Sequence, residues 1–321
     1  MTETIASTIR VNRLTFAYHR EPALRDVDFS LQQDAVGLLG PNGSGKTTLL
    51  RALLGQIDIK PGQVHVGDLD MARQAPAGRR RLGWMPERGG IIPGHSGVGL
   101  VAYMGELSGM PRQDAMQRAH EVLHFVGLKD ERYRHCETYS QGMRQRLKLA
   151  CALVHDPEWL LLDEPTSGLD PAGRVAMLEL VNDLAGRKGL GVILSTHLLA
   201  DVEATCNEIL VLREGRLLER HAVAPGDVGG KQVFEITGFG GEEDFVAALR
   251  RLAVNVEQDG RHITAVIDLD TLPQGEGAAT GRAVRAVLEL AQAHDYAPRR
   301  LRRRPVTLAD EFYSLVNPED D

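Results

Sequence analysis

The chain has 321 residues, of which 43% are hydrophobic and 25% are charged. This composition is typical of a globular protein and excludes global disorder, and the length allows one large domain and a small one. The formal net charge of −7 argues against a general nucleic-acid binder, although it is compatible with a local basic patch.

The apolar runs, such as residues 35–39 and 159–162, are as long as strands and too short to cross a bilayer. The first residues lack the basic and then apolar pattern of a signal peptide. The three cysteines, Cys136, Cys151 and Cys206, are far apart and odd in number. They have no metal-ligand spacing, and we expect reduced thiols in the cytosol.

Strand-like and helix-like segments alternate over the first 220 residues, which predicts an α/β layered domain. Residues 35–39 are apolar at every position, as in a parallel strand buried on both faces. A glycine-rich loop and a helix at 46–54 follow this strand. Residues 62–67 begin and end with glycine and alternate polar and apolar residues in between, which predicts a short strand near a sheet edge.

The next stretch, residues 99–127, has mainly helical periodicity and is broken at 109–111, with a second helix at 112–126. Asp170 followed by Pro171 predicts the N-cap and the first turn of another helix. The layered pattern returns as a helix, two buried strands and a hairpin, at residues 141–154, 159–162, 191–195 and 208–218.

Composition changes near residue 221, and residues 225–230 have the glycine and proline content of a linker. We therefore expect domains at 1–220 and 231–321, joined by a linker at 221–230. The second domain shows the order β-α-β-β-α, which suggests a small ferredoxin-like α+β fold, followed by a basic segment and a short helix at 307–312. Its expected elements are residues 232–236, 243–252, 254–257, 262–267 and 281–293.

Residues 40–47 fit the phosphate-loop pattern G-x-x-x-x-G-K-[ST]. Glycines let backbone N–H groups turn toward phosphate oxygens, and the helix that follows adds its positive end. Lys46 is expected to reach the β- and γ-phosphates, and the Thr47 hydroxyl is expected to bind Mg²⁺. A glycine-rich turn with an accidental lysine is the alternative, and the flanking strand and helix argue against it.

Asp163 and Glu164 follow a run of four apolar residues. A carboxylate at the end of a strand beside the phosphate loop is suited to Mg²⁺, and the next carboxylate can orient or deprotonate water. Such a pair often marks only a strand end, so its functional weight comes from the phosphate loop.

The ordered set of motifs resembles the ATP-binding cassette (ABC) family over about residues 8–220. Residues 139–146 resemble the family's L-S-G-G-Q signature, with Ser140 placed 23 positions before Asp163. Residues 163–170 look like the Walker B strand end and the D-loop. His197 is similar to the switch histidine, 34 positions after Asp163. Tyr18 is placed where the family stacks an aromatic ring on adenine.

The resemblance implies an α/β fold with a mixed sheet core, an antiparallel β subdomain and a helical subdomain, and it implies ATP and Mg²⁺ as cofactors. It assigns catalysis to Lys46, Glu164 and His197. Its candidate Mg²⁺ ligands are Thr47, Glu87 and Asp163. Its candidate nucleotide-binding residues are Tyr18, Gly40, Pro41, Asn42, Gly43, Ser44, Gly45, Lys46, Thr47, Thr48, Glu87, Ser140, Gln141, Gly142 and Asp170.

Two departures from the family pattern point to a subgroup. Gln141 and Met143 replace the commonest signature residues, while Ser140 and Gly142 remain. Glu87 stands where the Q-loop usually has glutamine; its carboxylate can offer an oxygen but cannot donate as an amide does. Both forms look like cassettes that power drug, antibiotic or polysaccharide exporters.

The resemblance also implies partners. Two cassettes would face each other head to tail, so that Ser140 of one chain serves the ATP of the other, with two copies or a paralogue as open alternatives. Separate membrane permease subunits would hold the pair at the cytoplasmic face of the membrane, with no nucleic acid involved. A non-transport cassette acting on ribosomes or DNA is the rival; a P-loop kinase or GTPase leaves the signature unexplained.

Two further features have alternative interpretations. The arginine clusters at residues 79–81 and 299–304 are either solvated faces or contacts to lipid head groups or an acidic partner. The helical stretch at 99–126 is either a packing insert or, by family analogy, part of a groove for a helix of the membrane subunit.

Overall fold

The computed structural model describes residues 8–19, 21–187, 189–222, 231–253, 255–269, 272 and 279–304. The chain divides into two compact units, residues 1–223 and 224–321. The expected linker core at 225–230 and the expected final helix at 307–312 lie outside the described residues. Within the described ranges, no helix has the length and apolarity needed to span a membrane.

A six-stranded mixed sheet forms the centre of the first unit, in the order β10-β9-β3-β8-β7-β6. The neighbours β9-β3, β3-β8, β8-β7 and β7-β6 are parallel, and only the hairpin β9-β10 is antiparallel. The strands are β3 (Ala35–Leu39), β6 (Leu82–Met85), β7 (Trp159–Asp163), β8 (Gly191–Thr196), β9 (Glu208–Arg213) and β10 (Arg216–Ala222). β10 thus extends beyond residue 220, where the sequence placed the end of the domain.

The central strands are buried on both faces, as their unbroken apolar runs predict. Every residue of β3, β7 and β8 is buried. Leu38 of β3 packs in a core with Leu49 and Leu50 of α1 (Lys46–Leu53). On the other face, a Cβ added at Gly37 would lie 2.4 Å from Val202 of α7 (Leu199–Thr205), so α7 sits against the strand backbone. Helices therefore cover this sheet on both sides.

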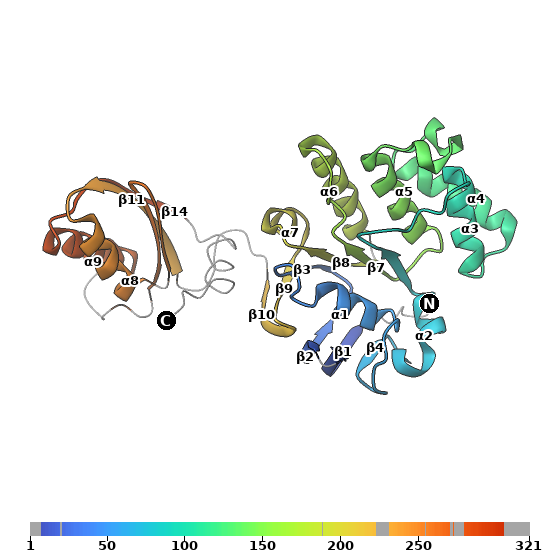
Figure 1. Ribbon diagram of the computed structural model, residues 1–321, viewed down its shortest axis with the longest axis horizontal. Coiled ribbons are helices and arrows are strands. Elements are labelled where there is room, and N and C mark those ends of the chain that lie inside the picture. The colour runs from blue at the N-terminus through green and yellow to red at the C-terminus, as the bar shows by residue number, and fades with distance from the viewer. Residues whose placement is uncertain are drawn as a thin grey trace, which may run out of the picture. The chain divides into compact units, whose positions relative to one another are not determined.

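A second, antiparallel sheet has the order β2-β1-β4-β5. Its strands are β1 (Ile9–Tyr18), β2 (Glu21–Leu31), β4 (Val64–Val66) and β5 (Leu69–Asp70). β4 confirms the short strand expected at 62–67 near a sheet edge, since it lies next to β5, the edge strand. The short helix α2 (Met71–Arg79) follows β5, and in Figure 1 this sheet lies at the bottom of the first unit.

The helical part of the first unit lies at the upper right of Figure 1. It contains α3 (Gly97–Leu107), α4 (Arg112–Phe125) and α5 (Gln141–Leu153), with two short 3₁₀ helices at Asp130–Tyr133 and Cys136–Thr138. The break expected at 109–111 separates α3 from α4. The next helix is α6 (Pro171–Ala185), and its N-cap Asp170 accepts a 2.8 Å hydrogen bond from the Gly173 N–H, as predicted.

The second unit has the chain order β-α-β-β-α-β and the sheet order β12-β13-β11-β14, in which all neighbours are antiparallel. One apolar cluster joins the sheet to its two helices. The elements are β11 (Lys231–Phe239), α8 (Glu242–Leu252), β12 (Asn255–Asp259), β13 (His262–Asp268), α9 (Ala279–Ala293) and β14 (Ala297–Arg304).

The basic segment at 299–304 forms most of β14, a strand that was not among the expected elements. It pairs along β11, with Arg300 opposite Thr237 and Arg302 opposite Glu235. The strand was missed because arginines occupy most positions, and Leu301 is its one partly buried member of the apolar cluster. The α/β class, with a mixed sheet, an antiparallel sheet and a C-terminal α+β unit, is confirmed.

We expect Gly191→Ala to destabilise the first unit. Gly191 lies directly across from Trp159, and a Cβ there would lie 2.4 Å from the indole of this fully buried side chain. Overpacking of this kind costs about 1–3 kcal/mol. Urea unfolding followed by tryptophan fluorescence measures the loss, since Trp84 and Trp159 are the two tryptophans of the chain and both belong to this unit.

Gly186→Ala is the matched control. Gly186 ends α6 at a φ of −71°, and the nearest atom to its added Cβ is 3.5 Å away. Such a change is expected to be neutral or stabilising by about 0.4–1 kcal/mol. Equal unfolding midpoints for the two variants would contradict the packing argument.

Candidate nucleotide-binding site

The sheet brings three motif segments to one edge. The loop at 40–45 follows β3, Asp163 ends β7, and His197 follows β8. Leu39 pairs with Thr196, and Asp163 pairs with Ser195. Because these strands are parallel neighbours, their carboxyl ends meet at the same edge, which is where α/β sheets place ligand sites.

The loop between β3 and α1 needs its glycines. Gly43 and Gly45 have φ values of 81° and 105°, and a Cβ at Gly45 would lie 2.7 Å from the Ala23 carbonyl oxygen. Lys46 opens α1, and its Nζ donates to the carbonyl oxygens of Gly40 (2.6 Å) and Pro41 (3.1 Å). The Ser44 hydroxyl is buried without a partner among the described residues. The loop thus presents polar groups with remaining bonding capacity.

A pocket of about 620 Å³ lies over this loop. Tyr18 is 41% exposed at its wall and meets Phe16 edge to face at 4.9 Å. An exposed ring beside a phosphate-type loop suits stacking on a planar base. The lining residues are Tyr18, Ala23, Asn42, Gly43, Ser44, Gly45, Lys46, Thr47, Thr48, Glu87, Arg88, Asp163, Glu164, Ser167 and His197.

Asp163 is a buried carboxylate held by two hydroxyls. It is 2% exposed and accepts hydrogen bonds from Thr47 Oγ1 (2.9 Å) and Ser195 Oγ (3.0 Å). Burial raises the pKa of Asp163, and these two hydrogen bonds act against that shift. A divalent cation beside it would favour the ionised form. The Thr47 hydroxyl and the Asp163 carboxylate are oxygen donors of the kind that Mg²⁺ prefers, so the residues present fit this metal.

Burial also lowers the pKa of Lys46, while the charges of Glu164, Asp163 and Glu87 act in the opposite direction. A phosphate group in the pocket would add negative charge near this ammonium and favour its protonated form. The buried lysine, the glycine loop and the positive end of α1 therefore fit a nucleotide phosphate.

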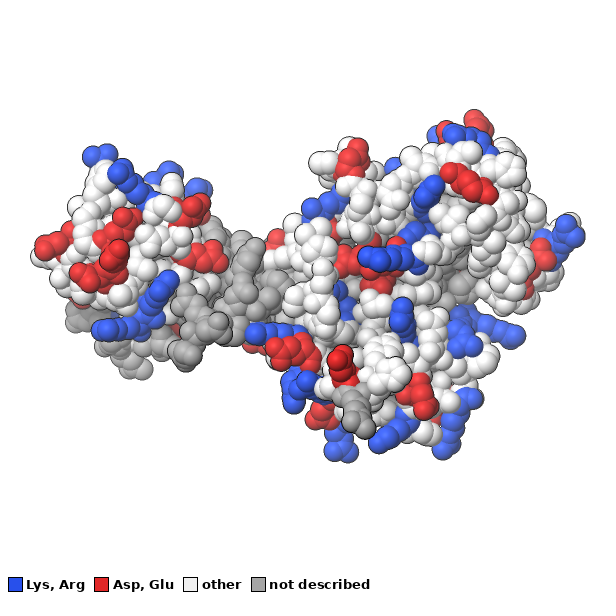
Figure 2. All heavy atoms as spheres, viewed as in Figure 1, with Lys and Arg blue, Asp and Glu red and all other residues white. Residues whose placement is uncertain are grey.

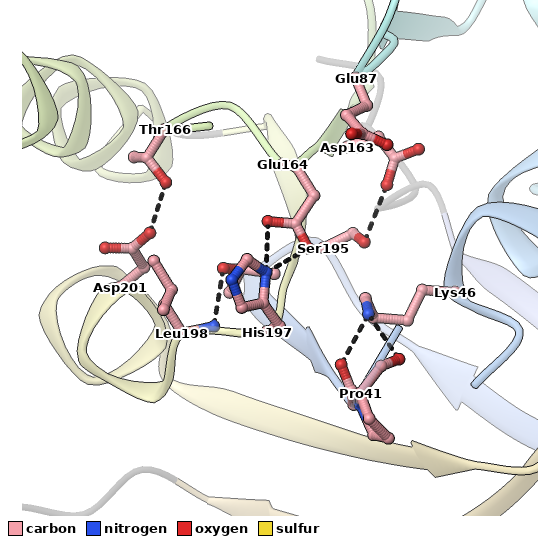
Figure 3. A network of polar contacts seen from close by, with 12 residues as sticks. Pro41, Lys46, Glu87, Asp163, Glu164, Thr166, Ser195, His197, Leu198 and Asp201 are labelled. Carbon is pink, nitrogen blue, oxygen red and sulfur yellow. Dashed lines mark hydrogen bonds and ion pairs between the residues drawn. The ribbon is translucent and has the colours of Figure 1, made fainter. Parts of the chain in front are cut away.

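Glu164 and His197 form a close pair, as Figure 3 shows. His197 Nδ1 lies 3.0 Å from both carboxylate oxygens of Glu164. Glu164 has a φ of 49°, which is unusual for a side chain larger than glycine, and its N–H donates to the Ser195 carbonyl oxygen at 2.9 Å. A carboxylate fixed by an imidazole at a pocket wall is suited to accept a proton from water.

Six predicted nucleotide-binding residues are not among the described residues that line this pocket: Gly40 and Pro41, whose carbonyl oxygens bind Lys46, and Ser140, Gln141, Gly142 and Asp170. Ser140 caps α5, accepting from the Met143 N–H at 3.3 Å, and lines a separate 310 Å³ pocket with Gly142. The Gln141 amide donates to the Ser167 carbonyl oxygen at 3.5 Å. Asp170 caps α6. The pocket thus gathers the phosphate-loop, Walker B and switch residues, and leaves the signature residues outside.

Some residues in or beside the pocket were not among the predicted site residues. Ser167 and Arg88 line the pocket, and Arg88 Nε lies 3.6 Å from the Glu87 carboxylate. Lys148 of α5 donates to the carbonyl oxygens of Pro86 (2.9 Å) and Glu87 (2.8 Å) while only 6% exposed. A lysine among the apolar positions of a helix was the available signal for Lys148.

Comparison with known proteins identifies the family. The "ABC transporter" family model matches residues 24–167. The linearmycin resistance ATP-binding protein LnrL of Bacillus subtilis is 31% identical over 76% of this chain and 79% of its own. The daunorubicin resistance ATP-binding protein DrrA3 of Streptomyces coeruleorubidus is 32% identical over 98% and 97%, respectively.

A solved structure of an ATP-binding subunit of an ABC transporter superposes with a TM-score of 0.60. It is 27% identical and covers 67% of this chain and 89% of its own. The chain belongs to the family of ABC transporter ATP-binding subunits. It is an ATPase with the ABC ATPase fold, and its relatives include proteins named for antibiotic and drug resistance.

We expect Glu164→Gln to keep ATP binding and to lower the turnover number by roughly 10²- to 10⁴-fold, the usual contribution of a general base. The amide keeps the volume but cannot accept the proton. Equilibrium binding of a fluorescent ATP analogue and steady-state phosphate release measure the two effects separately. Lys46→Ala is the contrasting variant, because it should lose nucleotide affinity. Near-normal turnover of Glu164→Gln would remove Glu164 from catalysis.

Proposed function

We propose that this chain is the ATP-hydrolysing subunit of an exporter, working as a cassette dimer on separate membrane permease subunits at the cytoplasmic face of the membrane. The observation that carries the dimer is the position of the signature residues, which lie outside the pocket of their own phosphate loop. The resistance functions in the relatives' names support export of a drug-like or antibiotic cargo.

The N-terminus of α5 has the features of an anion-binding site that could accept a phosphate group carried by a second chain. Ser140 is exposed, Gly142 is partly exposed, and α5 runs for 13 residues behind them. A helix N-terminus carries partial positive charge and free N–H groups, which favour phosphate oxygens. A partner cassette in the head-to-tail arrangement would bring its γ-phosphate to this point.

In the proposed site, ATP supplies the phosphate chain whose hydrolysis releases the dimer. Lys46 and the loop at 40–45 bind the phosphates, and Thr47 and Asp163 hold Mg²⁺, with Glu87 as a further oxygen donor. Glu164 takes the proton of water, and His197 holds its carboxylate and reaches toward the γ-phosphate. Asp170, next to the signature surface, belongs to the dimer contact. ATP then biases an open and a closed dimer by contacts made only in the closed state.

The permease is proposed to dock in a groove between the first sheet and the helical part. The lining of this 310 Å³ pocket combines apolar residues, among them Trp84, Pro86, Met104 and Leu107, with several polar and basic ones, and Leu107 is 64% exposed. A large exposed leucine beside a partly apolar groove suits an amphipathic helix of a partner. This supports the interpretation of residues 99–126 as a docking element.

The unit at 224–321 is proposed to be an accessory domain that steadies the dimer or contacts a partner. On the side visible in Figure 2, the surfaces of this unit and of the first unit both carry Lys and Arg interspersed with Asp and Glu. Such mixing supports a protein partner over nucleic acid, the alternative for a non-transport cassette. The boundary between the units at 223/224 supports a division near the expected linker.

The dimer predicts complementation between two inactive chains. Ser140→Arg should block the trans contact, and Lys46→Ala should empty the phosphate loop, so each variant alone lacks an intact composite site. A heterodimer of the two keeps one intact site. We expect mixing to restore part of the ATP-dependent dimerisation, measured by analytical ultracentrifugation. Wild-type hydrolysis by Ser140→Arg alone would contradict the trans arrangement.

The groove predicts a variant that separates hydrolysis from docking. Leu107→Glu should leave the basal turnover of the free chain unchanged and weaken its co-purification with the permease, because it places a charge on the apolar part of the docking surface. Val175→Glu is the matched control, since Val175 is 57% exposed on α6. Equal permease binding by both variants would contradict this groove. Stimulation of the ATPase by ribosomes or DNA would favour the non-transport alternative.

A further inference from the structure

Asp201 of α7 is a buried carboxylate that binds two separate segments of the chain. Its side chain is 0% exposed. Oδ2 accepts a 2.6 Å hydrogen bond from Thr166 Oγ1, and Oδ1 accepts a 2.6 Å charge-assisted bond from Arg174 Nε of α6. Figure 3 shows the Thr166 contact beside the Glu164–His197 pair. One carboxylate thus joins the loop after β7, the helix that follows this loop, and α7.

Thr166 lies two residues after Glu164, in a loop whose conformation needs support. Glu164 adopts a left-handed φ of 49°, which costs free energy for this residue type. The Ser167 N–H donates to the Glu164 carbonyl oxygen at 3.1 Å, so Thr166 belongs to the same tight turn. A restraint on Thr166 is therefore a restraint on the direction of the Glu164 side chain.

On the other side, Asp201 is tied to the segment that carries His197. The Asp201 N–H donates to the Leu198 carbonyl oxygen at 3.0 Å, and the Leu198 N–H donates to Thr196 Oγ1 at 3.0 Å. Together with the His197–Glu164 contact, these bonds close a ring that passes from Glu164 through Thr166, Asp201 and Leu198 back to His197.

We infer that Asp201 is a positioning residue for hydrolysis: its carboxylate fixes the Glu164 loop against the His197 segment, so that the two side chains meet at the pocket. The inference rests on the proposed roles of Glu164 and His197. Strong bonds in a buried site keep their geometry, and a displacement of about 1 Å at a reacting group can cost roughly 10²-fold in rate. The phosphate loop, which binds ATP, is not part of the ring.

The test compares Asp201→Asn, Thr166→Val and the double variant in the full chain. Asn has one oxygen in place of two, so it keeps the volume but loses an acceptor. We expect each single variant to lower the turnover number by roughly 10- to 100-fold with little change in KM for ATP. We expect the double variant to be no worse than the poorer single variant, because both break the same link. Thr166→Ser, which retains the hydroxyl, should restore turnover.

Thr205→Val is the matched control. The Thr205 hydroxyl also bonds Asp201, but it donates to the backbone carbonyl oxygen at 2.5 Å and takes no part in the ring. This variant should lower the melting temperature and keep the turnover number. Melting temperatures of all variants show whether a loss of activity follows a loss of folded protein.

The Glu164→Gln background distinguishes this inference from the proposed catalytic role. If Asp201 acts through Glu164, Asp201→Asn should add little further loss there. The positioning role would be overturned if Asp201→Asn lowered turnover as much in the Glu164→Gln background as in the wild-type chain, or if the turnover losses of Asp201→Asn and Thr166→Val added up in the double variant. It would also be overturned if Thr166→Ser failed to restore turnover, or if Thr205→Val lost as much turnover as Thr166→Val. Normal turnover in Glu164→Gln itself would instead refute the proposed general base.

Discussion

The cassette depends on one constraint, which is that charge must be kept at the buried carboxyl ends of parallel strands. Asp163 is nearly inaccessible at the end of β7, where ionisation is costly. Hydroxyls from the two adjacent motif segments, Thr47 and Ser195, compensate this cost by donating to it. The same bonds bring the phosphate loop and the switch segment into register with the strand that carries Glu164. The hydrogen bonds that stabilise the Asp163 carboxylate therefore also hold the three motif segments together.

Local signals explain what the sequence could predict. The glycine loop before Lys46 and the apolar run before Asp163 are short patterns with direct chemical meaning, and both proved to be strand ends at one edge. The pairing of β1 with β4, such as Ile9 with Val66, and the order of strands in each sheet depend on contacts between distant residues, which no local pattern contains. Asp201 was missed for this reason, since its partners Arg174 and Thr166 are 27 and 35 positions away.

The nucleotide pocket and the proposed docking groove share one short segment. Pro86 lines the groove, Glu87 lines the pocket, and Lys148 of α5 binds the backbone carbonyls of both. Burial lowers the pKa of Lys148, while Glu87 and Asp163 act against that shift. A displacement of α5 would therefore move the backbone of Glu87 directly. The segment that follows β6 thus connects the nucleotide pocket with the docking groove.

Strand β14 has a consequence for the solution behaviour of the second unit. It lies at the edge of its sheet, where one row of backbone donors and acceptors has no neighbouring strand in the described part of the chain. Arg299, Arg300, Arg302 and Arg303 are carried on this strand. Two such edges repel each other when they approach, and hydrated guanidinium groups oppose the flat contact that strand addition requires. The arginine-rich edge thus disfavours the addition of a further strand to this side of the sheet.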